Sequence, residues 1–201
     1  MMAIKDVLAA PWVYDLAQYV IRGTAYGPDF VSQYVKAKPG DRVLDIGCGT
    51  GVMLNHLPDV EYVGFDMSEA YIDACRKRFG NRGTFHQCVV TPDNVADYGQ
   101  FDIVLAVGVV HHLDDAQAKN MFTMASRALS SGGRLITLDG CYTTPQSRLV
   151  RRLLDNDRGE FVRTEPAYRA IAEGVFPKVT TAIRHDMFRI PYTVIVMECV
   201  T

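Results

Sequence analysis

The sequence lacks a long apolar run and has few cysteines. Its apolar stretches are short, such as 103–107, whereas a membrane-spanning helix needs about 20 apolar residues. The stretch 1–16 has no sustained apolar core, so we expect neither a signal peptide nor a membrane span. Five scattered cysteines without a CxxC pair argue against a disulfide framework and against a zinc site. No HxxxH spacing occurs either, so we expect no metal.

The chain also lacks an excess of either charge. Lys and Arg number 21, and Asp and Glu number 23, which leaves a net charge of −2. This balance gives no electrostatic reason to expect a nucleic acid or an anionic membrane as partner. With 48% hydrophobic and 22% charged residues, the composition is that of a globular domain. We expect a single domain over 1–201, in the cytoplasm, as a monomer or a homodimer.

What the chain does contain is a series of short apolar runs that alternate with amphipathic stretches. This alternation predicts an α/β fold with a parallel sheet. The expected parallel strands are 42–46, 61–66, 84–90, 101–107 and 134–138. The expected helices among them are 69–79, after Ser68, and 115–129, after Asp114. Two further strands, 178–186 and 191–200, have a connection too short for a parallel crossover, so we predict an antiparallel hairpin.

Two segments are longer than the sheet requires. Residues 1–40 precede the first strand and are predicted to be helical around 4–9, 12–21 and 28–37. Residues 139–177 leave room for two helices, one from Thr144–Pro145 and one from Thr164. Binding surfaces are commonly built on such additions.

The most specific signal is the run VLDIGCGTG at 43–51, in which a buried strand leads into Gly47, Gly49 and Gly51. Glycines allow a ligand to lie against bare backbone, and a helix is expected to follow them. Asp45, just before the loop, disfavours a pyrophosphate and suits an ammonium or sulfonium group. Asp66 ends the second strand, where a carboxylate accepts ribose hydroxyls. The pattern predicts a nucleoside ligand with a positively charged tail.

These motifs, taken together, resemble those of class I S-adenosylmethionine (SAM)-dependent methyltransferases, in particular small bacterial enzymes that act on small molecules. VLDIGCGTG resembles the first motif of that family and GFDMSEAYI the second. FDIVLAVGVVHHLDD and ALSSGGRLITLD resemble the motifs of the fourth and fifth strands. The resemblance covers about 40–140. It implies a Rossmann-like, doubly wound sheet of seven strands in the order 3-2-1-4-5-7-6, with strand 7 antiparallel.

The resemblance also implies SAM as cofactor and S-adenosylhomocysteine as product, without a metal. The residues it assigns to the cofactor are Asp45, Gly47, Cys48, Gly49, Gly51, Asp66, Met67, Val89 and Val107. The segment 1–40 would form a lid, with Tyr14 and Arg22 as further cofactor contacts. Because the family's acid after the third strand is missing, the adenine contact falls either to backbone near Cys88 and Val89 or to Asp93.

For the chemical step, His111 and His112 after the fourth strand are the candidate general bases; the alternative is that they only orient the loop. Tyr142, Arg148, Arg152 and Arg158 are candidate acceptor contacts; the alternative is a solvated helix face. The predicted reaction is methyl transfer to a hydroxyl of a small polar or sugar-like metabolite. The alternatives are a methyltransferase acting on protein or nucleic acid, and a SAM-binding domain without catalysis.

Overall fold

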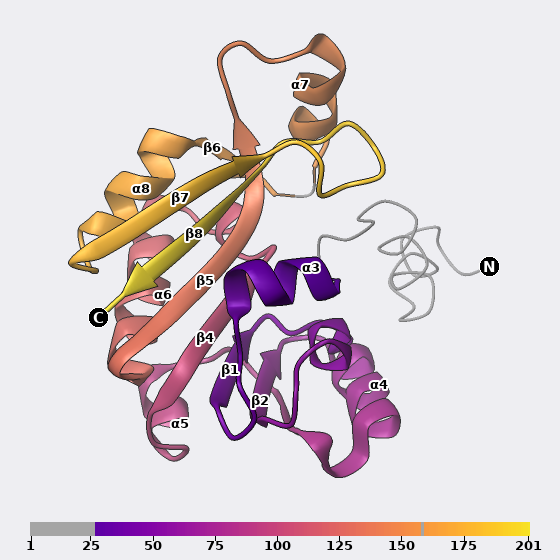
Figure 1. The fold of residues 1–201 in the computed structure, drawn as a ribbon, viewed down its shortest axis with the longest axis vertical. Coiled ribbons are helices and arrows are strands. Elements are labelled where there is room, and N and C mark those ends of the chain that lie inside the picture. The colour runs from indigo at the N-terminus through magenta and orange to yellow at the C-terminus, as the bar shows by residue number, and fades with distance from the viewer. Residues whose placement is uncertain (1–26, 158) are drawn as a thin grey trace.

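A mixed β-sheet lies at the centre of the computed structural model, which describes residues 27–157 and 159–201 (Figure 1). Within these residues the strands follow the order β3-β2-β1-β4-β5-β8-β7, and the short β6 pairs with β5 off this path. The strands are β1 (Arg42–Ile46), β2 (Glu61–Asp66), β3 (Thr84–Gln87), β4 (Phe101–Val107), β5 (Leu129–Tyr142), β6 (Arg163–Thr164), β7 (Lys178–Arg184) and β8 (Val194–Val200).

The strand directions confirm the predicted topology. Strands β1 to β5 pair in parallel, whereas β8 runs antiparallel to both of its neighbours, β5 and β7. The predicted strands six and seven are β7 and β8, so the observed order matches the predicted 3-2-1-4-5-7-6. The two-residue β6, inside the 139–177 insertion, is the one addition among the described residues.

The helices are α3 (Pro28–Phe30), α4 (Glu69–Phe79), α5 (Pro92–Ala96), α6 (Asp115–Ala128), α7 (Arg148–Asp155) and α8 (Glu165–Glu173). Four of the described helices, α4, α5, α6 and α7, begin at a residue whose side chain caps them. The Ser68 hydroxyl accepts a hydrogen bond from the Tyr71 N–H at the start of the predicted helix 69–79, and Asp114 and Gln117 form a reciprocal capping box. A π-helical turn, η1 (Val31–Val35), continues α3, and 3₁₀ turns lie at η2 (Val52–Asn55), η3 (Gly80–Arg82) and η4 (Val110–His112).

Several boundaries differ from the sequence prediction: β3 ends at Gln87 and not at 90, β5 begins at Leu129 and not at 134, β7 ends at Arg184 and not at 186, and β8 begins at Val194 and not at 191. Two further differences concern helices. The glycine loop leads into η2, a short 3₁₀ turn, and not into a longer helix. The first helix of the insertion begins at Arg148 and not at Pro145, because the Ser147 hydroxyl caps it by accepting from the Val150 N–H at 3.2 Å. The second helix follows Thr164 as predicted.

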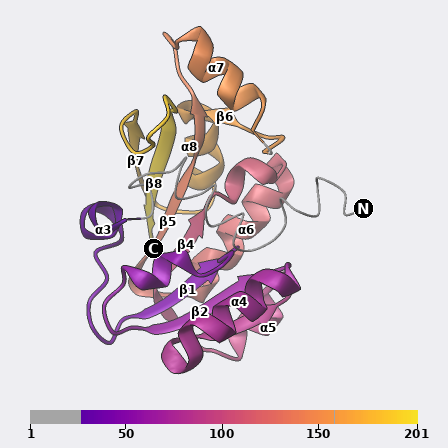
Figure 2. The same ribbon diagram turned by 90° about the vertical axis from the view of Figure 1, so that its right-hand side faces the viewer.

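The sheet is covered by helices on both faces (Figure 2). Along β8, Ile195 and Met197 belong to the core cluster that includes residues of α5, α6 and α8, whereas Val194 and Val196 belong to the cluster that includes residues of α3, α4 and α7. This alternation is the period-two pattern of a strand that is buried on both sides. None of the helices in the described ranges has the length and apolar character needed to cross a membrane.

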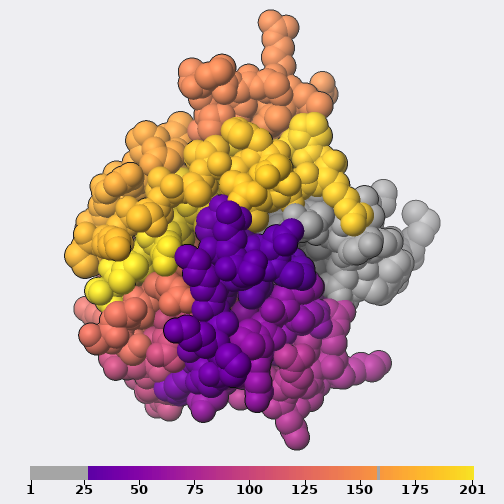
Figure 3. Space-filling model, viewed as in Figure 1, coloured from indigo at the N-terminus to yellow at the C-terminus, as the bar shows by residue number. Residues whose placement is uncertain are grey.

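The insertion 139–177 extends the molecule beyond the sheet. Strand β5 continues to Tyr142, past its predicted end at 138, and leads to α7, which protrudes at the top of the space-filling view (Figure 3). Leu154 is 1% exposed and anchors α7 to the core. Helix α7 is therefore attached to the rest of the fold by this buried contact. The predicted lid helices at 4–9 and 12–21 lie outside the described residues.

Candidate active site

The glycine loop after β1 has left-handed backbone at three positions. Gly47, Gly49 and Gly51 have φ values of +69°, +55° and +70°, which side chains with a Cβ rarely adopt. A Cβ at Gly47 would lie 2.8 Å from Val109 Cγ2, and one at Gly51 would lie 2.8 Å from Phe79 Cε2. The loop therefore needs glycine, and it lies at the carboxyl end of β1, the side on which open α/β sheets bind ligands.

Asp66, the last residue of β2, holds this loop to the neighbouring strand. Its Oδ2 accepts from the Gly49 N–H at 2.9 Å, and its Oδ1 accepts from the Ser68 N–H at 2.8 Å. The side chain is half-buried. Each carboxylate oxygen has a second lone pair, so Asp66 is still able to accept hydrogen bonds from hydroxyl groups.

Asp45 lies beneath the loop and is 4% exposed. Its Oδ2 accepts from the Tyr62 hydroxyl at 2.5 Å. Burial raises the pKa of Asp45 to about 7, although the Tyr62 hydrogen bond acts in the opposite direction, and the negative charge of Asp66 raises it further. Near neutral pH this carboxyl group is therefore able both to hold and to release a proton.

Two buried thiols lie beside the same loop. The Cys75 thiol on α4 donates to the Gly49 carbonyl at 3.3 Å, and Cys48 lies within the loop itself. A hydrogen bond with Cys75, together with burial, raises the pKa of Cys48 well above its usual range. Cys48 is therefore a neutral packing group in this structure, in contrast to the exposed Cys88.

The apolar side chains among the predicted cofactor residues differ in their exposure. Met67 is 72% exposed and Val89 is 58% exposed, whereas Val107 is half-buried. The Val89 carbonyl accepts from Asn94 Nδ2 at 2.9 Å, and Asp93 is exposed in the first turn of α5. Large exposed apolar side chains next to a hydrogen-bonding carboxylate suit a flat, partly apolar ligand.

His111 lies at the end of β4, and a carboxylate from the end of β5 fixes its position. Asp139 Oδ1 lies 2.7 Å from His111 Nδ1 and also accepts from the His111 backbone N–H at 3.1 Å. The Asp139 side chain is fully buried, and its Oδ2 has no hydrogen-bond partner among the described residues. This pairing sets the imidazole so that Nδ1 faces Asp139 and Nε2 points away from it, toward Asp157.

The loop after α7 covers the other side of the imidazole. Asp157 Oδ1 lies 3.6 Å from His111 Nε2, and Asp157 Oδ2 accepts from the Tyr192 hydroxyl. A Cβ at Gly159 would lie 1.9 Å from His111 Cδ2. Glycine at 159 is therefore what allows this loop to approach the histidine so closely.

His112, the second candidate base, is exposed, and its ring centroid lies 4.2 Å from that of His111. It shares the turn η4 with His111, whereas Asp139 binds the His111 ring alone. Of the pair, His111 is thus the histidine whose ring Asp139 orients. Among the residues that the structure describes, no group of three His, Cys, Asp or Glu side chains is able to hold a metal ion.

The predicted acceptor residues gather around α7. The Tyr142 hydroxyl donates to Asp155 Oδ1 at 2.7 Å, and the Arg148 and Arg152 side chains are exposed on the helix. Arg163 has a different environment, because it is 9% exposed and forms an ion pair with the exposed Asp115. Three predicted site residues lie outside the described part of the chain: Tyr14, Arg22 and Arg158.

Sequence analysis did not identify the pairing of His111 with Asp139, nor the positions of Asp157 and Tyr192 beside it. A signal for the first pairing was present, since Asp139 directly follows the run LITL of the fifth strand. The carboxyl ends of neighbouring parallel strands meet at one edge of a sheet, so residues after β4 and β5 are expected to lie together. Asp157 and Tyr192 come from loops, for which no such rule exists.

Comparison with known proteins agrees with this geometry. Residues 44–135 match a family model described as a methyltransferase domain. The tRNA (carboxymethyluridine(34)-5-O)-methyltransferase of Saccharomyces cerevisiae is 33% identical over 92 residues, which cover 44% of this chain and 32% of the yeast protein. The chain covers between 22% and 32% of the length of three such curated relatives.

Solved structures extend the similarity to most of the chain. An O-methyltransferase family protein from Burkholderia thailandensis has a TM-score of 0.68 at 18% identity, over 94% of this chain and 59% of that one. Geranyl diphosphate C-methyltransferase from Streptomyces coelicolor, solved with S-adenosylhomocysteine, has a TM-score of 0.64 at 15% identity, over 86% of this chain and 74% of that one.

The strand order and these solved structures define a Rossmann-like fold of the kind found in class I methyltransferases, as the sequence motifs predict. More particularly, the part of the chain that matches the methyltransferase domain model, residues 44–135, runs from β1 into β5.

Proposed function

We propose that this protein transfers the methyl group of SAM to a hydroxyl oxygen of a small polar acceptor. The observation that carries the proposal is the buried pair of His111 and Asp139, since methyl transfer to a hydroxyl benefits from a base. We expect the reaction to take place in the cytoplasm, because the odd number of scattered cysteines suits a reducing compartment.

The chain's own groups fit SAM. We assign the ribose hydroxyls to Asp66, whose carboxylate retains free lone pairs. Asp45 would face the positively charged tail, and the loop glycines would allow the cofactor to lie against backbone. Met67, Val89 and Val107 would cover the adenine, and Cys48 would line the loop. Tyr14 and Arg22 remain proposed contacts from the segment before the described residues.

When bound, SAM supplies a methyl group that its sulfonium makes electrophilic. His111 Nε2 would accept the acceptor's hydroxyl proton as the oxygen–carbon bond forms and the carbon–sulfur bond breaks. Asp139 would hold the ring and stabilise the imidazolium that results. Much of the rate would come from alignment, since Asp139 and the loop at Gly159 leave the ring little freedom. His112 would orient the turn, and Tyr142, Arg148, Arg152 and Arg158 would contact the acceptor.

The first experiment is calorimetric titration of the full chain with SAM, S-adenosylhomocysteine and NAD. Both adenosyl ligands should bind and NAD should not. The Asp66→Ala variant should bind them at least tenfold more weakly, since one charge-assisted hydrogen bond contributes about 1.5–3 kcal/mol. Asp59→Ala, at an exposed position outside the site, is the matched control. Equal affinity of the Asp66 variant and the wild type would refute the assignment.

A second candidate acceptor is RNA, which the name of the yeast relative suggests. The net charge of −2 makes this acceptor less favourable. Release of S-adenosylhomocysteine with small hydroxylated compounds, but not with tRNA, would support the proposed acceptor class. SAM binding without turnover on any acceptor would instead point to a binding domain without catalysis.

A further inference from the structure

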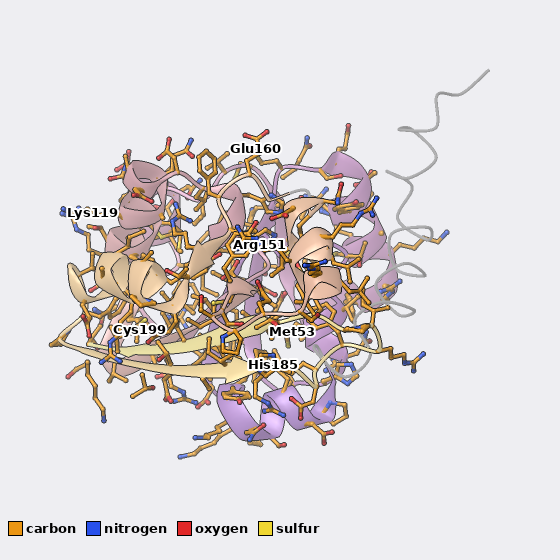
Figure 4. The ribbon with its side chains drawn as sticks, turned by 90° about the horizontal axis from the view of Figure 1, so that it is seen from above. Met53, Lys119, Arg151, Glu160, His185 and Cys199 are labelled. Atoms are coloured by element: carbon orange, nitrogen blue, oxygen red, sulfur yellow. The ribbon has the colours of Figure 1, made fainter. Side chains whose placement is uncertain are left out.

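A pocket of about 370 Å³ lies on the protruding end of the insertion, separate from the glycine loop. Its walls come from the connection between β5 and α7 and from α7 itself, and Figure 4, which looks down on this end of the molecule, shows Arg151 on that helix. The residues lining it are Thr143, Thr144, Gln146, Arg148, Arg151, Arg152 and Asp155. The volume is at the lower end of the range for small-molecule sites, about 300–1,000 Å³.

The charges in this pocket are unbalanced. Three arginines face one carboxylate, Asp155, so the lining has a net charge of +2. Asp155 already accepts from the Tyr142 hydroxyl and lies 3.4 Å from Arg151 Nε, while the Arg151 guanidinium lies 4.3 Å from the centre of the Tyr142 ring. Arg151 and Asp155 thus satisfy each other, and the excess charge belongs to the other two arginines.

Arg148 and Arg152 make no side-chain hydrogen bond or ion pair with any described residue, whereas several other arginines of the fold, such as Arg42, Arg134 and Arg184, have carboxylate partners. They are four residues apart on α7, so they lie on the same side of the helix, with Cβ atoms about 5–6 Å apart. Two neighbouring guanidinium groups match the donors that a tetrahedral oxyanion requires. Thr144 also lines the pocket, whereas the Thr143 hydroxyl already donates to the Pro145 carbonyl at 3.3 Å.

We infer that this pocket binds a phosphate group of the acceptor, an inference that rests on the proposed function. A phosphate monoester carries a charge of about −1.5 to −2 near pH 7, which the free charge of the pocket balances. The pocket also lies close to the proposed base. Asp155 and Asp157 are two residues apart, so their Cα atoms are at most about 7 Å from each other, and Asp157 Oδ1 is 3.6 Å from His111 Nε2.

A small phosphorylated compound fits these observations better than an RNA strand. RNA-binding surfaces present a stripe of positive charge, whereas here two free arginines lie in one concave site on a chain with a net charge of −2. The acceptor class that we infer is therefore a hydroxylated metabolite that carries a phosphate monoester. The phosphate would be held at α7 while the hydroxyl lies near His111.

The test is titration of the full chain with inorganic phosphate at low ionic strength, followed by the Nε–Hε signals of arginine in NMR spectra. The Arg148→Gln/Arg152→Gln double variant should bind phosphate at least tenfold more weakly than the wild type. Arg127→Gln on α6 removes the same charge from an exposed arginine outside the pocket, and it should leave phosphate binding unchanged. Malonate and a short single-stranded RNA are the competing probes.

Three outcomes would overturn the inference: equal phosphate affinity in the double variant, malonate binding as tight as phosphate, or tighter RNA binding that Arg127→Gln weakens equally. SAM binding is measured on the same samples and should be unaffected by the double substitution. If wild-type protein fails to bind SAM but binds phosphate through these arginines, the proposed function fails while the anion site stands.

Discussion

The free energy of unfolding of the unliganded protein should depend strongly on pH through Asp45, and replacing Asp45 by Asn should remove this dependence. Asp45 is 4% exposed, and its pKa in the fold is about 7, against an ordinary value of 3.8. At a pH between these two pKa values, Asp45 is protonated in the folded chain and deprotonated in the unfolded chain. The stabilisation is therefore complete below about pH 4, and it is lost as the pH rises through about 7.

The magnitude follows from the two pKa values. They differ by about three pH units, and one unit corresponds to 1.36 kcal/mol, so the term is worth about 4 kcal/mol. An Asn side chain has nearly the shape of the protonated carboxyl, and its oxygen is still able to accept from the Tyr62 hydroxyl. The Asp45→Asn variant should thus gain up to about 4 kcal/mol over the wild type between about pH 4 and pH 8.

The assay is urea unfolding of both proteins across this pH range, with Asp59→Asn, at an exposed position, as control. The difference in the free energy of unfolding between variant and wild type removes the contributions of the other titrating groups. A difference that stays constant with pH would refute the assignment of a raised pKa to Asp45. If Asp45 faces the charged tail of SAM, the same variant should bind SAM more weakly at pH 8 although its fold is more stable.

Two other substitutions test the histidine site. Asp139→Asn removes the charge behind His111, and with a productive acceptor it should lower kcat by about 100-fold while leaving SAM affinity unchanged; an equal loss of SAM affinity would show that Asp139 supports the whole site instead. Gly159→Ala would place a Cβ 1.9 Å from His111 Cδ2, so urea unfolding should show a loss of about 1–3 kcal/mol. Gly174→Ala, where the nearest atom is 3.3 Å away, is the control, and equal stabilities of the two variants would contradict the close packing at Gly159.

The sheet was predictable because each of its strands has a local signal. The apolar runs of β1, β2 and β4 are bounded by turn residues, and helix α4 begins and ends where its Ser68 cap and Gly80 predict. The short hairpin connection was enough to predict the reversed β8.

Other features depend on contacts between distant segments, and these were not predictable in the same way. The end of β5 at Tyr142 is determined by pairing with β8 and β6, which no local pattern indicates. The order of the strands places His111 and Asp139 at the same edge of the sheet, but no local sequence pattern indicates that their side chains pair. Asp157 lies next to His111 only because Gly159 allows the loop to approach the ring. Glycine occurs in polar loops for many reasons, so its presence at 159 does not predict this contact.

The two buried thiols beside the glycine loop have a consequence for observing the loop in solution. Exposed Cys88 should react at once with a thiol reagent, whereas Cys48 and Cys75 react only when the loop opens away from α4. The raised pKa of Cys48 slows its reaction further, because the thiolate is the reactive form. Because Cys141 and Cys199 are also buried, labelling has to be followed separately at Cys48 and Cys75. The labelling rate of these two thiols measures the frequency of loop opening, and a ligand that binds the closed loop should lower this rate in proportion to its occupancy.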